Sequence, residues 1–216
     1  MKSSRDMLIE SLGRDLPAVR SIGNVDMMAS AWLLASALYV VAIIHVMGPI
    51  RPNALAQLVS EPRFLVETVC GVLAIAVTSL IAFRAAVPGA LNQKLVWLGT
   101  VLMVLWLANY VVGLASPALE PSMHGKREAC VWETLVYALP PMLLGYLFIR
   151  RLYPLQLVKT AMSLSLAAGM LPALYMQIAC MYVPDHILKF HILPGLMMPL
   201  IGALIVWLAR SRVQQS

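Results

Sequence analysis

Residues 27–47 read MMASAWLLASALYVVAIIHVM and contain no lysine, arginine, aspartate or glutamate. About 20 consecutive apolar residues cross the roughly 30 Å hydrocarbon core of a bilayer as an α-helix. Further stretches of similar length and apolarity follow at 64–83, 95–115, 130–149, 157–179 and 190–209. Of the 216 residues, 61% are hydrophobic and 12% are charged, which is unlike a water-soluble domain. The sequence therefore predicts an all-α polytopic membrane protein with six transmembrane helices and short loops.

Basic residues are distributed unevenly around these helices. The chain divides into a polar head at 1–26, a helical domain at 27–209 and a tail at 210–216. Eleven of the 16 Lys and Arg lie on the side of the membrane that also holds the head and the tail. Because cytoplasmic loops carry an excess of basic residues, we expect both termini to be cytoplasmic. The net charge of +6 then reflects membrane topology and indicates no direct nucleic-acid binding.

The head carries apolar residues at three- and four-residue spacing, as one face of a short helix would. These residues are Leu8, Leu12, Leu16 and Val19. Ser3 or Ser4 is the expected N-cap, and Pro17 limits the C-terminal end. So short a helix gains most of its stability from a surface that it packs against. The sequence leaves open whether this surface is a protein partner or the inner leaflet of the membrane.

Two of the three cysteines lie at the ends of consecutive spans. Cys130 opens the fourth span and Cys180 closes the fifth, so antiparallel packing places both at the outer interface. Cys70 lies inside the second span, where a lone cysteine is usually a packing residue. A pair of thiols at an outer face can form a disulfide or bind a soft metal ion. The alternative is that both cysteines are small, unreactive residues that happen to end spans.

Three polar residues close to this pair are candidate co-ligands. His124 lies six residues before Cys130, and His186 lies six residues after Cys180. Glu133 shares a helical face with Cys130, because the two are three residues apart. Imidazole commonly binds metals beside thiolate, although this spacing matches no standard zinc motif. The identity of the metal is left open.

Among the six predicted spans, only the last three contain proline. These prolines are Pro140, Pro141, Pro172, Pro194 and Pro199. Proline removes a backbone donor and kinks a helix, so this half is either pliable or statically kinked.

The motifs of common enzymes are absent. The chain has no phosphate-binding loop, no dinucleotide glycine fingerprint, no HExxH and no C-x-x-C. The sequence therefore predicts neither catalysis nor a cofactor. Two rival functions stay open, a small transporter of metal ions or thiol compounds and a membrane thiol oxidase that reduces a quinone.

Several short motifs, taken in order, resemble the NrsF-type anti-sigma factors, and the resemblance covers essentially the whole chain. It begins with Met7-Leu8-Ile9, Leu12, Asp15 and Pro17 in the head. It continues with Glu61-Pro62-Arg63-Phe64 before the second span, Pro88-Gly89 after it, Cys130, Arg150-Arg151 with Pro154, and Cys180.

The resemblance implies a six-span protein of the bacterial inner membrane that negatively regulates an extracytoplasmic-function sigma factor. The sigma factor would be held by the cytoplasmic head around Leu8, Ile9 and Leu12. Cys130 and Cys180 would detect metal or oxidative stress, with a soft metal ion as a candidate signal. In that account sensing releases the sigma factor.

Overall fold

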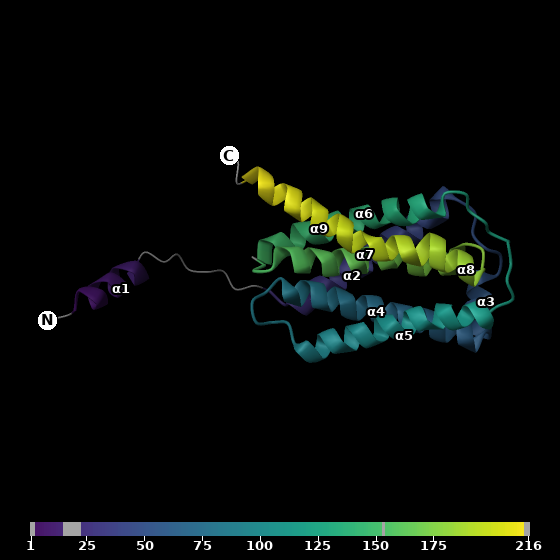
Figure 1. Ribbon diagram of the computed structural model, residues 1–216, viewed down its shortest axis with the longest axis horizontal. Helices are drawn as coiled ribbons and strands as arrows, with labels where there is room; N and C mark the ends of the chain where they lie inside the picture. Colours follow the sequence, from purple (N-terminus) through teal and green to yellow (C-terminus); the bar gives the residue numbers. More distant parts are fainter. Residues whose placement is uncertain (1–2, 15–22, 153, 214–216) are drawn as a thin grey trace.

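The computed structural model describes residues 3–14, 23–152 and 154–213, and its long helices form one bundle (Figure 1). The elements in chain order are α1 (Ser4–Arg14), α2 (Val25–Met47), α3 (Ala54–Ser60), α4 (Pro62–Ala85), α5 (Gln93–Ala115), α6 (Cys130–Ile149), the 3₁₀ turn η1 (Arg150–Leu152), α7 (Leu157–Ala179), α8 (Pro184–Ile187), the π-helical turn η2 (Leu188–Ile192) and α9 (Leu193–Val213). The described ranges contain no strand, only an isolated bridge between Ser122 and Tyr182.

Six helical segments are long and apolar enough to cross a membrane, which confirms the six predicted spans. The sixth segment begins at Pro184 and not at residue 190 as predicted. Pro184 occupies the first turn of α8, and α8, η2 and α9 follow one another without a break. The short helix α3, in the connection between the first two spans, was not predicted.

Local side-chain chemistry sets where three of the spans begin. The Asn24 side chain accepts hydrogen bonds from the backbone of Asp26 and Met27, so α2 starts at Val25. Asn92 caps α5 in the same way through the backbone N–H of Lys94. Pro62 stands in the first turn of α4, where a missing N–H costs nothing.

Helix α7 lies at the centre of the bundle, packed against α2, α4, α6 and α9. Small residues permit this close approach. A Cβ added to Gly169 of α7 would lie 2.6 Å from the carbonyl oxygen of Gly195 in α9. Consecutive spans run antiparallel in Figure 1, so the start of α6 and the end of α7 share one end of the bundle.

Helix α1 is drawn apart from the bundle in Figure 1. Ser3 caps the N-terminus of α1, as expected from the sequence. Its hydroxyl accepts a hydrogen bond from the backbone N–H of Arg5, and its own N–H donates to the Asp6 carboxylate. Leu8, Ile9 and Leu12 are each about 60% exposed. The expected continuation through Leu16, Pro17 and Val19 falls outside the described residues. The part of the head that is described therefore offers an uncovered apolar surface.

Candidate metal centre

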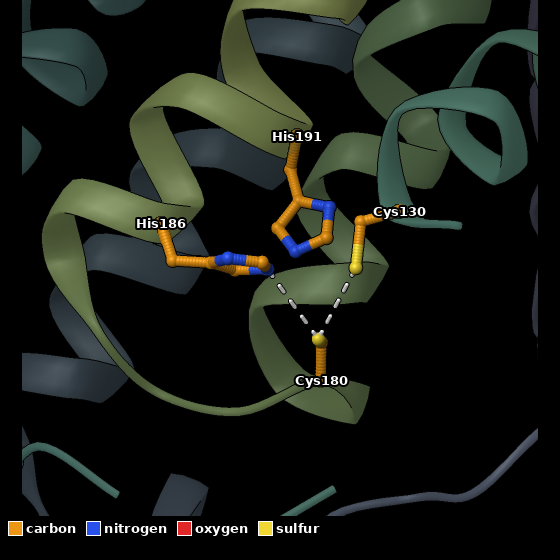
Figure 2. Close-up of side chains that lie close together, drawn as sticks. All are labelled: Cys130, Cys180, His186 and His191. Carbon is orange, nitrogen blue, oxygen red and sulfur yellow. Dashed lines mark hydrogen bonds between the residues drawn. The ribbon is translucent and has the colours of Figure 1, made fainter. Parts of the chain in front are cut away.

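The two predicted cysteines meet at one end of the bundle. Cys130 is the first residue of α6 and Cys180 directly follows the last residue of α7. Their sulfur atoms are 3.8 Å apart, and both residues are buried (Figure 2). The antiparallel arrangement expected from the sequence thus brings together two thiols that are fifty residues apart in the chain.

Two histidines complete the group. Nε2 of His186, in α8, lies 3.8 Å from the Cys180 sulfur. His191, in the π-helical turn η2, packs edge-on against His186 with 5.0 Å between ring centroids. One ligand atom from each of Cys130, Cys180, His186 and His191 lies within 4.8 Å of all the others. The four side chains converge in Figure 2 from α6, the end of α7, α8 and η2.

The distances are close to those of a tetrahedral metal site. A Zn–S bond of about 2.3 Å in tetrahedral geometry implies sulfur atoms about 3.8 Å apart. The observed separation of the two sulfurs is 3.8 Å. Two thiolates with two imidazoles form a closed donor set that suits Zn²⁺, Cd²⁺ and other borderline or soft ions.

His191 gives the independent sign of a ligand site. The residue is fully buried, and neither ring nitrogen has a hydrogen-bond partner within bonding geometry among the described residues; its nearest polar influence is the Cys180 sulfur. Burying an unpartnered polar group costs about 1–3 kcal/mol in proteins. A metal ion bound by one of these nitrogens would remove that cost.

The π-helical turn explains how His191 reaches the sulfurs. Its defining bond runs from the backbone N–H of Leu193 to the carbonyl of Leu188, five residues earlier. Pro194 follows directly, and it can neither donate to the carbonyl of Phe190 nor tolerate that oxygen beside its ring. The extra residue in the turn relieves this conflict and brings residues five apart, such as His186 and His191, to one face.

The structure does not bring the other two predicted co-ligands to the sulfurs. His124 is exposed in the loop between α5 and α6 and is outside the group of four. Glu133 points to Arg127 instead, with Nε and Nη2 of the arginine donating to its two oxygens at 2.7 and 3.2 Å. His191 was missed because it falls inside the predicted sixth span, 190–209, whereas the candidate histidines were sought in the loops beside the cysteines.

Electrostatics favours a thiolate at Cys180. Hydrogen bonds from Cys130 and, secondarily, from His186 hold the pKa of Cys180 well below its usual range, against the opposing effect of burial. The Cys130 thiol also donates to the backbone carbonyl of Arg127 at 3.2 Å. With Cys180 as a thiolate, the proton of Cys130 is the thiol proton that a metal ion would displace.

A buried cation lies beside this end of α7. The backbone N–H of Arg51 donates to the carbonyl of Ala179 at 2.7 Å. Its guanidinium stacks over the rings of Phe64 and Tyr182, at 5.3 and 5.6 Å from their centroids. Burial lowers the pKa of Arg51, and the nearby Tyr182 and Cys180 oppose that shift. The positive charge in turn supports a thiolate at Cys180.

An open pocket leads from the surface of the bundle to Cys130 and His186. It has a volume of about 690 Å³, and its lining includes Cys130, His186, Met123, Lys126 and Met181. An ion in solution at this end of the bundle therefore has an open approach to Cys130 and His186. Cys70, by contrast, lies inside α4, as the interpretation as a packing residue expects.

Comparison with protein families gives one match, to NrsF, described as negative regulator of sigma F, over residues 12–210. Comparison with curated proteins and with solved structures gives no match. The matched range includes Leu12 of the head, all six spans and the four residues of the metal centre. The chain belongs to the NrsF family of negative regulators of a sigma factor.

Proposed function

We propose that this protein is a metal-responsive anti-sigma factor of the bacterial inner membrane. In this proposal it sequesters an extracytoplasmic-function sigma factor and releases it when an outer metal centre captures a soft cation. Family membership supplies the regulation of a sigma factor. The observation that supports the metal signal is the four-ligand group that contains the buried, unpartnered His191.

The donor set favours metal capture over disulfide formation as the primary signal. A disulfide uses two sulfurs at about 2.05 Å and leaves no role for two converging imidazoles. Here Cys180 is in contact with both Cys130 and His186. Oxidation of the same thiols is the second candidate, which the 3.8 Å separation of the sulfurs favours.

Helix α1 is the proposed contact for the sigma factor. Leu8, Ile9 and Leu12 leave an apolar surface uncovered on a short helix. An amphipathic helix of this kind binds well in an apolar groove of a partner protein. The uneven distribution of basic residues supports cytoplasmic termini, which places α1 on the side of the membrane where a sigma factor is found.

The test is retention of a sigma factor by the full-length chain in detergent, with and without Cd²⁺. The probe is an extracytoplasmic-function sigma factor from the same bacterium, with any such factor encoded in the same operon tested first. We expect Cd²⁺ to weaken binding about tenfold or more, a typical size for coupling between two sites. The double variant Cys130→Ser, Cys180→Ser should bind the sigma factor without responding to Cd²⁺, while Cys70→Ser should respond as the wild type does.

Two results would reject the proposal. Equal release from the wild type and the double cysteine variant would remove the sensing role from Cys130 and Cys180. Release by an oxidant such as diamide, with no effect of Cd²⁺, would assign the signal to disulfide formation.

A further inference from the structure

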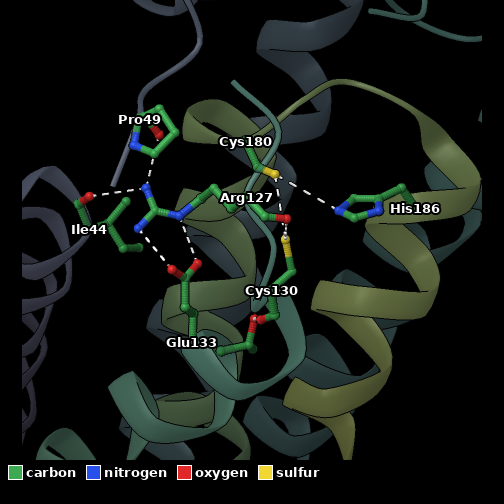
Figure 3. Close-up of polar contacts among 8 residues, drawn as sticks. Ile44, Pro49, Arg127, Cys130, Glu133, Cys180 and His186 are labelled. Atoms are coloured by element: carbon green, nitrogen blue, oxygen red, sulfur yellow. Dashed lines mark hydrogen bonds and ion pairs between the residues drawn. The ribbon is translucent and has the colours of Figure 1, made fainter. Parts of the chain in front are cut away.

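Arg127 is a buried arginine that joins two separate parts of the outer end. It lies in the loop before α6, and its side chain is 1% exposed. The guanidinium forms a forked ion pair with Glu133 of α6. Its Nη1 donates to the carbonyl oxygens of Ile44, at 3.3 Å, and Pro49, at 2.9 Å (Figure 3). One side chain therefore bonds α6 to the end of α2 and to the chain that leaves it.

The chain after α2 is shaped around this guanidinium. A Cβ added to Gly48 would lie 2.6 Å from Cζ of Arg127, so any other residue there would displace the arginine. Burial opposes the charge of Arg127, but the bonds to Glu133 outweigh burial and raise its pKa. The contact is charged and forked, with the arginine side chain buried, which makes it specific in geometry.

The backbone of the same residue is bonded to the metal centre. The Cys130 thiol donates to the carbonyl oxygen of Arg127 at 3.2 Å. Figure 3 shows both connections of Arg127, its carbonyl toward Cys130 and its guanidinium toward Ile44 and Pro49. No other residue between the metal centre and α2 is needed to connect them.

Helix α2 leads from this contact to the opposite end of the bundle. Its 23 residues span about 35 Å. At that end Asp26 accepts two bonds from Arg84 of α4, at 2.7 and 2.6 Å. The head with α1 precedes α2 in the chain. A displacement of the outer end of α2 would be carried along this helix to its N-terminal end at Val25.

We propose that Arg127 is the residue that couples the metal centre to α2 and the head. The inference rests on the proposed function and names the step by which the signal leaves the site. A divalent cation held by Cys130, Cys180, His186 and His191 would engage the Cys130 sulfur and replace its 3.2 Å contact with the Arg127 carbonyl. The loop moves, and the guanidinium withdraws from Ile44 and Pro49.

The test measures coupling and not binding alone. The quantity is the ratio of the sigma-factor dissociation constants with saturating Cd²⁺ and without it, for the full-length chain. We expect the ratio to be about ten or more for the wild type and for Glu120→Gln, a charge removal at an exposed position of the connection between α5 and α6. For Arg127→Gln we expect a ratio within about twofold of one, with Cd²⁺ still bound.

A purely structural role of Arg127 gives a different result. It would weaken binding of the sigma factor or of Cd²⁺ and leave the ratio unchanged, which would overturn the inference. A ratio of one in the wild type would instead reject the proposed function. Gly48→Ala is the second variant, because it displaces the guanidinium without removing a charge, and it should also lower the ratio.

Hydrogen exchange on the wild type tests the inference without a substitution. Cd²⁺ should speed backbone exchange in residues 44–51, and Cys130→Ser, Cys180→Ser should abolish that change. Unchanged exchange in residues 44–51 on Cd²⁺ binding would overturn the inference, even if the sigma factor is released.

Discussion

His191 is the single residue on which the metal assignment depends most. Its ring is fully buried between α6, α7 and η2, with no hydrogen-bond partner for either nitrogen among the described residues. Without a ligand, such a histidine is a net cost to folding. With a metal ion bound, the same nitrogen contributes to affinity. Substitution of His191 should therefore stabilise the metal-free protein and weaken the stabilisation that a bound metal ion provides.

His191→Leu tests this reversal. We expect the metal-free variant to unfold at a higher temperature than the wild type, because an unpartnered imidazole worth about 1–3 kcal/mol is removed. The stabilisation that Cd²⁺ gives should fall sharply, because one ligand is lost. Thermal unfolding in detergent with and without Cd²⁺ measures both. His45→Leu, at an exposed histidine, is the control; a lower melting temperature of the metal-free His191 variant would contradict the assignment.

The number of protons released on metal binding is a second residue-scale prediction. Because the pKa of Cys180 is lowered, its thiolate persists at any pH above that pKa, and only Cys130 holds a proton to lose. At pH 8.5, where free imidazole is neutral, binding of Cd²⁺ should release about one proton and not two. Calorimetry in buffers of different ionisation enthalpy measures this number. Release of two protons would show that both thiols are protonated at rest.

The sequence was sufficient to predict that the two cysteines lie together, but it did not predict which residues lie beside them. Cys130 and Cys180 are juxtaposed because consecutive spans are antiparallel, which any six-span topology requires. His124 and Glu133 were selected by distance along the chain. Glu133 is bonded to Arg127, a pairing that depends on how the loop before α6 folds. His191 depends on a local change in helical register, which apolar periodicity does not reveal.

The π-helical turn η2 is the element that positions both histidines. Pro194 disfavours a regular α-helix at this point, because its ring would meet the carbonyl of Phe190. The turn takes up one extra residue, so the helix before it is rotated with respect to α9. A π-helical turn inside a helix often marks a functional site for this reason.

Pro194→Ala should weaken the metal centre without altering a ligand. Alanine restores the backbone N–H at position 194, so the chain can form a regular α-helix there. In a regular helix the side chains of His186 and His191 would point away from the sulfurs. We expect Cd²⁺ affinity to fall about tenfold, as for other substitutions outside the ligand set. Pro199→Ala, in the interior of α9, is the matched control. Affinity equal to that of the wild type would show that the turn does not depend on Pro194.

Helix α1 is the element proposed to hold the sigma factor. The double variant Leu8→Ser, Ile9→Ser should weaken sigma-factor binding about 100-fold, since central apolar contacts dominate such interfaces. Cd²⁺ affinity measured without the sigma factor should be unchanged. Glu10→Gln, half a turn from Leu8 on the helix, serves as the control. Normal sigma-factor binding by the double variant would favour the inner leaflet as the surface that α1 covers.

At the scale of the whole molecule, most of the fold was predictable because the bilayer restricts the choices. Long apolar segments must be helices, since lipid offers no partner for a bare backbone. The confirmed spans follow from that rule alone. The central place of α7 was not predictable, because it arises from glycine contacts such as that between Gly169 and Gly195.

The account as a whole requires a signal to cross the membrane. The metal centre is at one end of the bundle, and the head joins α2 at the other. Arg127 and α2 form the proposed connection between the two. An effect of metal on the sigma factor must therefore appear even when the ion and the sigma factor are on opposite sides of a sealed bilayer.

Proteoliposomes that enclose a fluorescent sigma factor and a metal chelator test this requirement most directly. The full-length chain is inserted with its termini inside, and Cd²⁺ is added only outside. The account predicts that fluorescence anisotropy inside the vesicles falls as the sigma factor leaves the membrane, and that Cys130→Ser, Cys180→Ser abolishes the fall. Unchanged anisotropy in the wild type, or a fall only when Cd²⁺ is placed inside, would contradict it.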